Sequence, residues 1–197
     1  MARIDPAERA VLPQHEPTFQ MVEAAMGFLP SSMPTMAKAP GLLEAFGSLA
    51  ATITMMGQID NGLAQMIANV ASHAAGCRYC QAHTAAHAVH AGVPNEKIAN
   101  VWEFETSDLF SEAERAALRV AQAAAQVPNA VTDQLFAALS NYYSEAQIIQ
   151  IVATISMFGF LNRWNDTLAT TLEPEPLALA TEHLGDKGWT AGKHAAN

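Results

Sequence analysis

Apolar segments of helical length, separated by glycine and proline, are the feature that most limits what this chain can fold into. No run alternates with a period of two for long enough to predict a sheet. Two capping boxes, Ser111 with Glu114 and Ser144 with Gln147, mark the starts of two helices. The sequence therefore predicts an all-α protein with helices over 17–28, 35–56 (notched at Pro40 and Gly41), 60–75, 78–91, 93–104, 112–126, 131–141 and 145–171.

The domain organisation follows from length and from the lack of linker composition. The chain has 197 residues, enough for one domain with a substantial core, and no glycine/serine-rich or charged stretch divides it. We predict a single domain over 1–197, in which 1–15 and 177–197 are peripheral arms or pack on a neighbouring subunit. Pro174 and Pro176 are expected to break the chain before a weak C-terminal tail.

Charge and hydropathy exclude several classes of partner. The formal net charge is −9, which argues against a nucleic-acid surface, and no basic run is present to attract anionic lipid. The N-terminus lacks a signal-peptide pattern, and no apolar stretch reaches the roughly 18 residues expected of a membrane span. We therefore expect a cytoplasmic protein that binds neither nucleic acid nor membrane. In that compartment a CxxC pair is usually catalytic or metal-binding.

The chemistry-bearing residues gather in "AAGCRYCQAHTAAHAVHAG" at 74–92, which contains both cysteines and three of the seven histidines. Gly76 ends one predicted helix, so Cys77 and Cys80 occupy the first turn of the next. Residues three apart share one helical face, and the partial positive charge of a helix N-terminus stabilises a thiolate. His83 follows Cys80 by one turn and could take up a thiol proton or hold the thiolate. The spacing therefore predicts a dithiol redox centre.

Two other interpretations compete with the redox centre. Buried cysteines often only pack. Cys77, Cys80, His83 and His87 also form a zinc-ligand set on paper, but on a straight helix Cys77 and His87 would lie about 15 Å apart. A subset such as His83 and His87 could bind an ion only with a partner from elsewhere. We therefore expect no metal and no cofactor. His73 and His87 could face the thiols, whereas the positions of His15, His183 and His194 carry no prediction.

The motif "GCRYCQAHT", with the preceding "LAQMIANVASHAA", resembles the carboxymuconolactone decarboxylase and alkylhydroperoxidase D superfamily, in particular its peroxidase-related branch. The segment "AMGFLPSSMPTMAKAPGLLEAF" and the C-terminal half, including "NRWND" at 162–166, are similar to that branch as well. The resemblance covers about residues 20–172. It implies an all-α fold assembled as a homo-oligomer, commonly a trimer or hexamer.

The resemblance also implies a peroxidase cycle. Cys80 would attack a hydroperoxide and become a sulfenic acid, Cys77 would resolve it as a disulfide, and a dithiol or lipoyl-type protein would reduce that disulfide. Gln65 and Thr84 stand where the alkylhydroperoxidase branch has a relay glutamate and histidine, and Tyr79 stands where it has a histidine between the cysteines. His83 is the expected substitute in that relay.

We therefore predict a thiol-dependent peroxidase with Cys80, Cys77 and His83 as catalytic residues. The alternatives are a non-catalytic redox-sensing or metal-binding helical module and a carboxymuconolactone decarboxylase-like lyase. Arg163 and Asp166, three residues apart, are expected to form a helical ion pair at a subunit contact.

Overall fold

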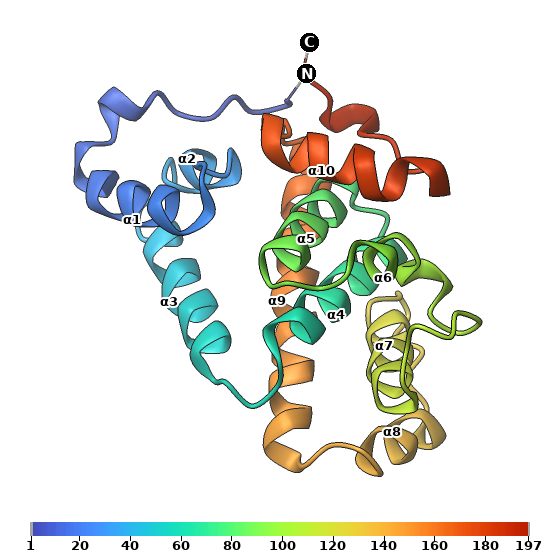
Figure 1. Cartoon of the computed structure of the whole chain (residues 1–197). Helices are drawn as coiled ribbons and strands as arrows, with labels where there is room; N and C mark the ends of the chain where they lie inside the picture. The colour runs from blue at the N-terminus through green and yellow to red at the C-terminus, as the bar shows by residue number, and fades with distance from the viewer. Residues whose placement is uncertain (1, 197) are drawn as a thin grey trace.

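The computed structural model describes residues 2–196, and every regular element in that part of the chain is helical (Figure 1). The all-α prediction is therefore confirmed. The α-helices are α1 (Glu16–Met26), α2 (Ser32–Met36), α3 (Leu42–Met55), α4 (Asn61–Ala74), α5 (Arg78–His90), α6 (Asn95–Ala99), α7 (Glu112–Ala124), α8 (Asp133–Ser140), α9 (Glu145–Leu168) and α10 (Pro174–Leu184). Short 3-10 turns are η1 (Arg9–Val11), η2 (Pro13–His15), η3 (Val101–Glu103), η4 (Gly185–Lys187) and η5 (Gly192–His194). None of the helices in the described range is long and apolar enough to cross a membrane.

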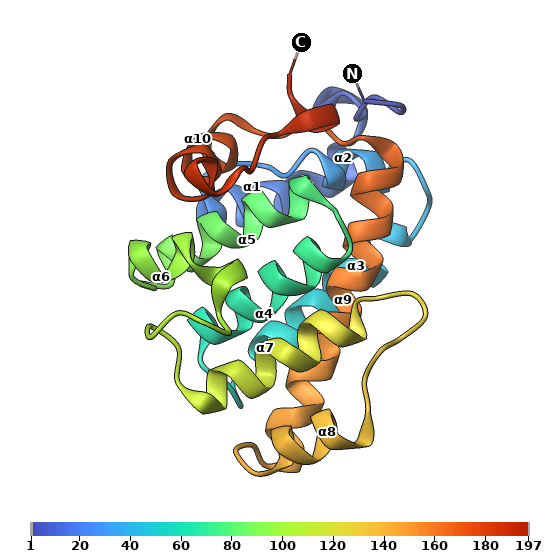
Figure 2. The ribbon, with the colours of Figure 1, turned by 90° about the vertical axis from the view of Figure 1, so that its right-hand side faces the viewer.

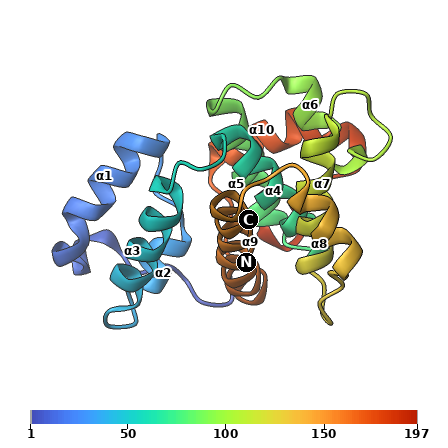
Figure 3. The same ribbon diagram turned by 90° about the horizontal axis from the view of Figure 1, so that it is seen from below.

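The long helix α9 separates two groups of helices. Figures 1 and 3 show α1, α2 and α3 on one side of α9, and α4 to α8 on the other. The larger core lies on the second side, where α4 packs against α5, α7 and α9. A smaller core of Leu12, Phe19, Met36 and Leu43 fills the first side, and Leu161 and Trp164 pack against it. The α9 helix therefore contributes apolar side chains to both cores.

A tight turn at Gly76 connects α4 to α5. Gly76 has a φ of +75°, a left-handed conformation that glycine adopts without the steric cost of a Cβ. The backbone N–H of Cys77 then donates to the Ser72 carbonyl at 3.0 Å, which closes the last turn of α4. This turn fixes Cys77 as the residue immediately before α5.

Local sequence signals set most helix starts correctly. Both predicted capping boxes, at Ser111 and at Ser144, are present with reciprocal side-chain and backbone bonds. The single helix expected over 35–56 is wrong, because α2 ends at Met36 and α3 begins at Leu42. Pro40 has no N–H to continue a helix, and Gly41 takes a φ of +78°, so the notch is a complete break.

The expectation of a weak, peripheral tail after Pro174 is also wrong. Pro174 is the first residue of α10, a position where its fixed φ favours a helix and its missing N–H costs nothing. Figure 2 shows α10 lying over α5, against which it packs. Leu184 and Trp189 join the larger core, with exposures of 0% and 4%. Residues 177–196 therefore cover the helix that carries the thiols.

Two isoleucines on α9 offer a matched test of this packing. Ile151 is 0% exposed and Ile149 is 60% exposed. We expect Ile151→Ala to lower the free energy of unfolding by about 2–5 kcal/mol, because it removes buried methylene groups and leaves a cavity. Ile149→Ala should change it by less than about 0.5 kcal/mol. Urea unfolding of the two variants measures both values, and equal losses would contradict the assignment of α9's buried face.

Candidate functional site

The two thiols lie at the start of α5, as the sequence predicts. Cys77 is the N-cap residue and Cys80 lies in the first turn. Both are free cysteines, with exposures of 0% and 2%. The Asn165 amide of α9 donates to the Cys80 sulfur at 3.6 Å. The two free thiols therefore lie together in the larger core, closed off from bulk solvent.

Burial decides the protonation state of Cys80. Removal from water raises the pKa of the Cys80 thiol well above its ordinary value, and the neighbouring Cys77 thiol raises it further. The hydrogen bond from Asn165 acts in the opposite direction but does not outweigh burial. Cys80 is consequently a neutral thiol at pH 7, so any reaction at its sulfur requires a group that removes the proton.

His83, one turn beyond Cys80, is held by a buried carboxylate. Its Nε2 lies 2.7 Å from Oε2 of Glu173, the residue that precedes α10. Tyr79 donates its hydroxyl proton to Oε1 of the same carboxylate at 2.8 Å, and the backbone N–H of Ser31 donates to that oxygen too. The Tyr79 ring stacks on the His83 ring with centroids 4.3 Å apart. Three segments distant in sequence therefore fix the orientation of the imidazole.

The Glu173 carboxylate is ionised despite its burial. Burial opposes ionisation, but the hydrogen bonds from His83 and from the Ser31 backbone together hold the pKa of Glu173 below its ordinary value. Burial, together with the same negative charge, raises the pKa of Tyr79, so the phenol stays protonated. Because the carboxylate can only accept, His83 carries its proton on Nε2 and Nδ1 is the nitrogen that can exchange one.

Glu173 is a residue that the sequence analysis missed. Gln65 stands at the position expected for a relay glutamate but has an amide, whereas Glu173 places a carboxylate against His83. The amide nitrogen of Gln65 instead lies 3.5 Å from Asn61 on its own helix. Thr84 has a local role, since its hydroxyl donates to the Cys80 carbonyl at 2.8 Å and accepts from Asn69 at 2.9 Å.

The other histidines of the motif divide into two environments. His73 stacks on Trp102 with centroids 4.2 Å apart, and burial lowers its pKa. His87 lies beside His83, with ring centroids 6.4 Å apart, and burial lowers its pKa to about 4. Both rings are therefore neutral at pH 7.

A second group of polar side chains surrounds Cys77. The Cys77 sulfur, an Asp166 carboxylate oxygen and a His194 ring nitrogen all lie within 4.8 Å of one another. His194 is 1% exposed, so this histidine, to which the sequence attached no prediction, belongs to the site. Among the described residues, only Cys77, Asp166 and His194 bring three donor atoms close enough together to hold a metal ion. The donor atoms of Cys77, Cys80, His83 and His87 do not converge in this way.

The expected ion pair between Arg163 and Asp166 is not formed. Asp166 binds Lys193 instead, with Nζ 2.7 Å from Oδ2. The Arg163 guanidinium turns back along α9 and donates to the Gly159 carbonyl at 2.9 Å. Lys193, which follows α10, therefore takes the place of Arg163 as the ion-pair partner of Asp166.

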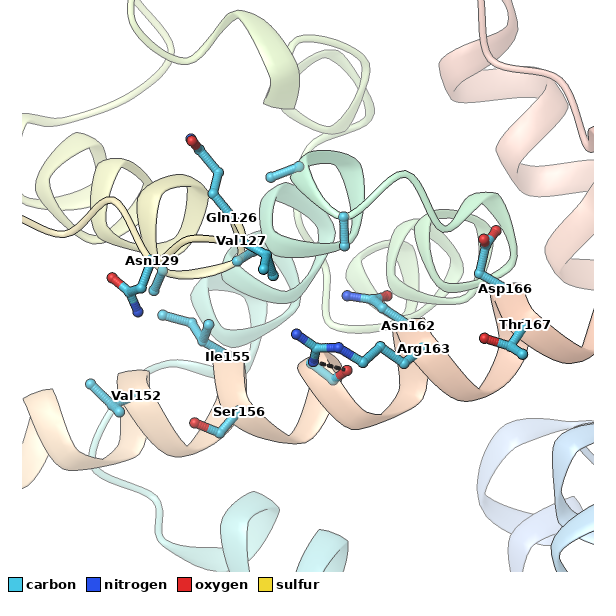
Figure 4. Close-up of a pocket in the computed structure, with 15 residues that line it drawn as sticks. Gln126, Val127, Asn129, Val152, Ile155, Ser156, Asn162, Arg163, Asp166 and Thr167 are labelled. Atoms are coloured by element: carbon cyan, nitrogen blue, oxygen red, sulfur yellow. Dashed lines mark hydrogen bonds between the residues drawn. The ribbon is translucent and has the colours of Figure 1, made fainter.

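A cavity of about 810 Å³ runs along α9 and ends at Asp166 (Figure 4). Its other walls are the end of α4 and the segment that follows α7. Asn162 lies on the wall, is 2% exposed, and has no hydrogen-bond partner for either amide atom among the described residues. Both amide atoms are shielded from solvent, so a ligand in the cavity could hydrogen-bond to Asn162 only after a movement of this wall. Since Asp166 also adjoins Cys77, this cavity reaches the surroundings of the thiols.

The fold and site together define a helical protein with a dithiol centre at the start of a buried helix. The model of the carboxymuconolactone decarboxylase family matches residues 40–123. The solved structure of the debrominase Bmp8 C82A in complex with 2,3,4-tribromopyrrole is similar at 40% identity and a TM-score of 0.85. That match covers 91% of this chain and 96% of the relative. The chain belongs to the carboxymuconolactone decarboxylase family.

More distant structures share the same fold. An uncharacterised peroxidase-related protein from Ralstonia eutropha JMP134 matches with 24% identity and a TM-score of 0.80, over 89% of this chain and 94% of that one. A peroxidase-related protein from Silicibacter sp. TM1040 matches with 17% identity and a TM-score of 0.74, over 88% and 90%. None of the curated proteins matches the chain significantly.

Replacement of the buried carboxylate tests the His83 network. We expect Glu173→Gln to lower the free energy of unfolding at pH 7 by about 1–3 kcal/mol, because charge-assisted hydrogen bonds are lost. The pKa of Glu173 is lower in the folded chain than its ordinary 4.5, so its ionisation stabilises the fold above that pH. This contribution is lost as pH falls through the folded value.

The measurement is urea unfolding between pH 3 and pH 7, roughly the range that brackets carboxyl titration. Wild type should lose stability toward acid more steeply than Glu173→Gln. The control is Glu175→Gln, because Glu175 makes only a half-exposed contact with His90 at 3.2 Å. A Glu173→Gln profile parallel to wild type would contradict an ionised, buried Glu173.

Proposed function

We propose that this protein is a thiol-dependent reductase that removes an electrophilic atom from its substrate and stores the oxidation as a Cys77–Cys80 disulfide. The first substrate class is a brominated nitrogen heterocycle. The observation that carries this proposal is the buried, reduced CxxC pair, with His83 held by Glu173 one turn beyond it. The 40% identity to a debrominase over 91% of the chain supports the choice of substrate class.

The first step takes place at Cys80. His83 accepts the Cys80 proton at Nδ1, and the ionised Glu173 stabilises the resulting imidazolium. The Cys80 sulfur attacks the bromine, the carbon–bromine bond breaks toward carbon, and the imidazolium protonates that carbon. The products are the debrominated ring and a Cys80 sulfenyl bromide.

The second step closes the disulfide. The Cys77 sulfur attacks the Cys80 sulfur, the sulfur–bromine bond breaks, and bromide leaves with the electron pair. The Cys77 proton is released to solvent. In sum, two thiols and an aryl bromide give a disulfide, an arene, bromide and a proton. A small dithiol then reduces the disulfide by exchange and restores the two thiols.

A hydroperoxide is the second candidate substrate. It presents an electrophilic oxygen in place of bromine, and the same two steps yield an alcohol, water and the disulfide. The near-complete burial of both sulfurs favours this candidate, because a small peroxide needs less opening of the structure than a substituted ring does.

Steady-state turnover with dithiothreitol distinguishes these candidates. We expect wild type to release bromide from pyrroles of increasing bromination over many cycles, and Cys80→Ser to show no reaction above background. His83→Gln should lower the rate by about 10²- to 10⁴-fold, the usual range for general acid–base catalysis. Cumene hydroperoxide, assayed in parallel, tests the second substrate class.

The parallel assays also test the non-catalytic alternatives. A single stoichiometric oxidation without turnover would identify a redox sensor and contradict the proposed enzyme. Turnover that survives Cys80→Ser would contradict the role of the thiol pair.

The cavity along α9 provides a test of where the substrate binds. Asn162 offers one donor and one acceptor beside Asp166, which suits a ring that carries both an N–H and polar substituents. We expect Asn162→Leu to raise KM by about 10-fold or more, since a ligand hydrogen bond of about 1.4 kcal/mol corresponds to that factor, and to change kcat little. Gln126→Leu, at an exposed position on the same cavity wall, is the control. Equal KM values for both variants would exclude this cavity as the substrate site.

A further inference from the structure

The proposed reaction uses Cys77 but gives no role to the two polar side chains beside it, Asp166 and His194. The three residues come from the N-cap of α5, the last turns of α9 and the turn η5. Their donor atoms lie within 4.8 Å of one another, and Cys77 and His194 are 0% and 1% exposed. A thiol, an imidazole and a carboxylate placed together can act as a nucleophile, its base and the group that stabilises the protonated base. This requires the imidazole nitrogen nearest the thiol to carry no proton.

The backbone sets the tautomer of His194. Its Nδ1 lies 2.8 Å from the Thr170 carbonyl oxygen, which can only accept, so Nδ1 carries the proton. Burial lowers the pKa of His194, and the ring is neutral at pH 7. Nε2 therefore presents a lone pair. It has no hydrogen-bond partner in the described part of the chain and lies 3.5 Å from Asp166 Oδ1.

Asp166 is fixed in place and favours a proton on His194. Lys193 binds its other oxygen at 2.7 Å, which holds the carboxylate in one orientation. A lone pair that faces a carboxylate is unfavourable, and a proton on Nε2 converts the contact into a charge-assisted hydrogen bond. The Lys193 ammonium beside the cluster disfavours any added positive charge, and it disfavours a divalent cation more strongly than a single proton.

We propose that His194 takes the proton from Cys77 when Cys77 attacks oxidised Cys80, and that Asp166 stabilises the imidazolium. This inference rests on the proposed function and completes its second step. The Cys77 S–H bond breaks and its proton moves to His194 Nε2. The sulfur's electron pair forms the bond to the Cys80 sulfur, and the Cys80 leaving group departs as bromide or hydroxide. His194 then returns the proton to solvent or to a hydroxide leaving group.

The site thus contains a separate acid–base pair for each thiol. His83 with Glu173 serves Cys80, and His194 with Asp166 serves Cys77. The titratable groups that surround Cys77 are Cys80 on its own helix, Asp166 on α9, and Lys193 and His194 on η5. Each thiol therefore has its own candidate base on a different element.

A substrate-free measurement tests the inference without relying on the proposed function. In a Cys80→Ser background, Cys77 is the only thiol, and its rate of reaction with a small thiosulfonate reports how readily its proton is removed as the sulfur attacks. We expect His194→Gln in that background to lower this rate near neutral pH by about tenfold or more, because the general base is lost, and Asp166→Asn to lower it by a smaller factor. His90→Gln, at a half-exposed site, should leave the rate unchanged. Unchanged rates in both His194→Gln and Asp166→Asn would overturn the inference.

A kinetic measurement separates a chemical role from a structural one. In a single turnover of the otherwise wild-type chain with peroxide, a dione reagent traps the Cys80 sulfenic acid. We expect His194→Gln to slow disulfide closure by about 10²-fold or more, with more trapped intermediate, while the rate of Cys80 oxidation stays the same. The difference from wild type should shrink at alkaline pH, where hydroxide replaces His194 as the base.

Three outcomes would count against the inference. Equal loss of both steps, with a lowered Tm, would assign His194 a structural role. Binding of one zinc ion per reduced chain, lost in His194→Gln, would replace the proton role with a metal site. If Asp166→Asn folds normally and closes its disulfide at the wild-type rate, the imidazolium is not stabilised as proposed.

Discussion

The buried carboxylate of Glu173 is the constraint on which the arrangement of the thiol site depends. Its two oxygens accept from His83, Tyr79 and the Ser31 backbone, so one side chain connects α2, α5 and the start of α10. A buried ion with fewer donors would be protonated or excluded. Because the carboxylate needs all these donors, the N-terminal helices and the C-terminal segment must both close over α5 for the site to form.

The closure has a direct effect on reactivity. Burial keeps Cys80 protonated, so that in the proposed reaction it depends on His83, whose free nitrogen is determined by the bond to Glu173. An exposed thiol would react with many oxidants without assistance. Here the same desolvation that suppresses unassisted reaction also strengthens each hydrogen bond that assists the intended one. Selectivity and catalysis therefore have a common physical origin in the removal of water from α5.

Local sequence signals predicted most of the helix starts and the position of the two thiols. Ser111 and Ser144 marked their helix starts, and the Gly76 turn placed Cys77 and Cys80 in the first turn of α5, because capping and turn conformation depend on neighbouring residues. Glu173 and His194 could not be found in this way. Glu173 lies 90 residues from His83, and only tertiary packing brings them together. The start of α10 at Pro174 was not predicted, because proline occurs both where one helix ends and at the first residue of another.

The division of the site between two parts of the chain has an evolutionary consequence. The α4–α5 hairpin supplies the sulfur atoms, whereas Glu173 and His194, to which we assign roles in proton transfer, come from the segment after α9. Substitutions in that segment can change which leaving group is protonated, or how fast the disulfide closes, while the CxxC hairpin stays the same. Members of one family can thus diverge in chemistry without any change in the motif by which the family is recognised.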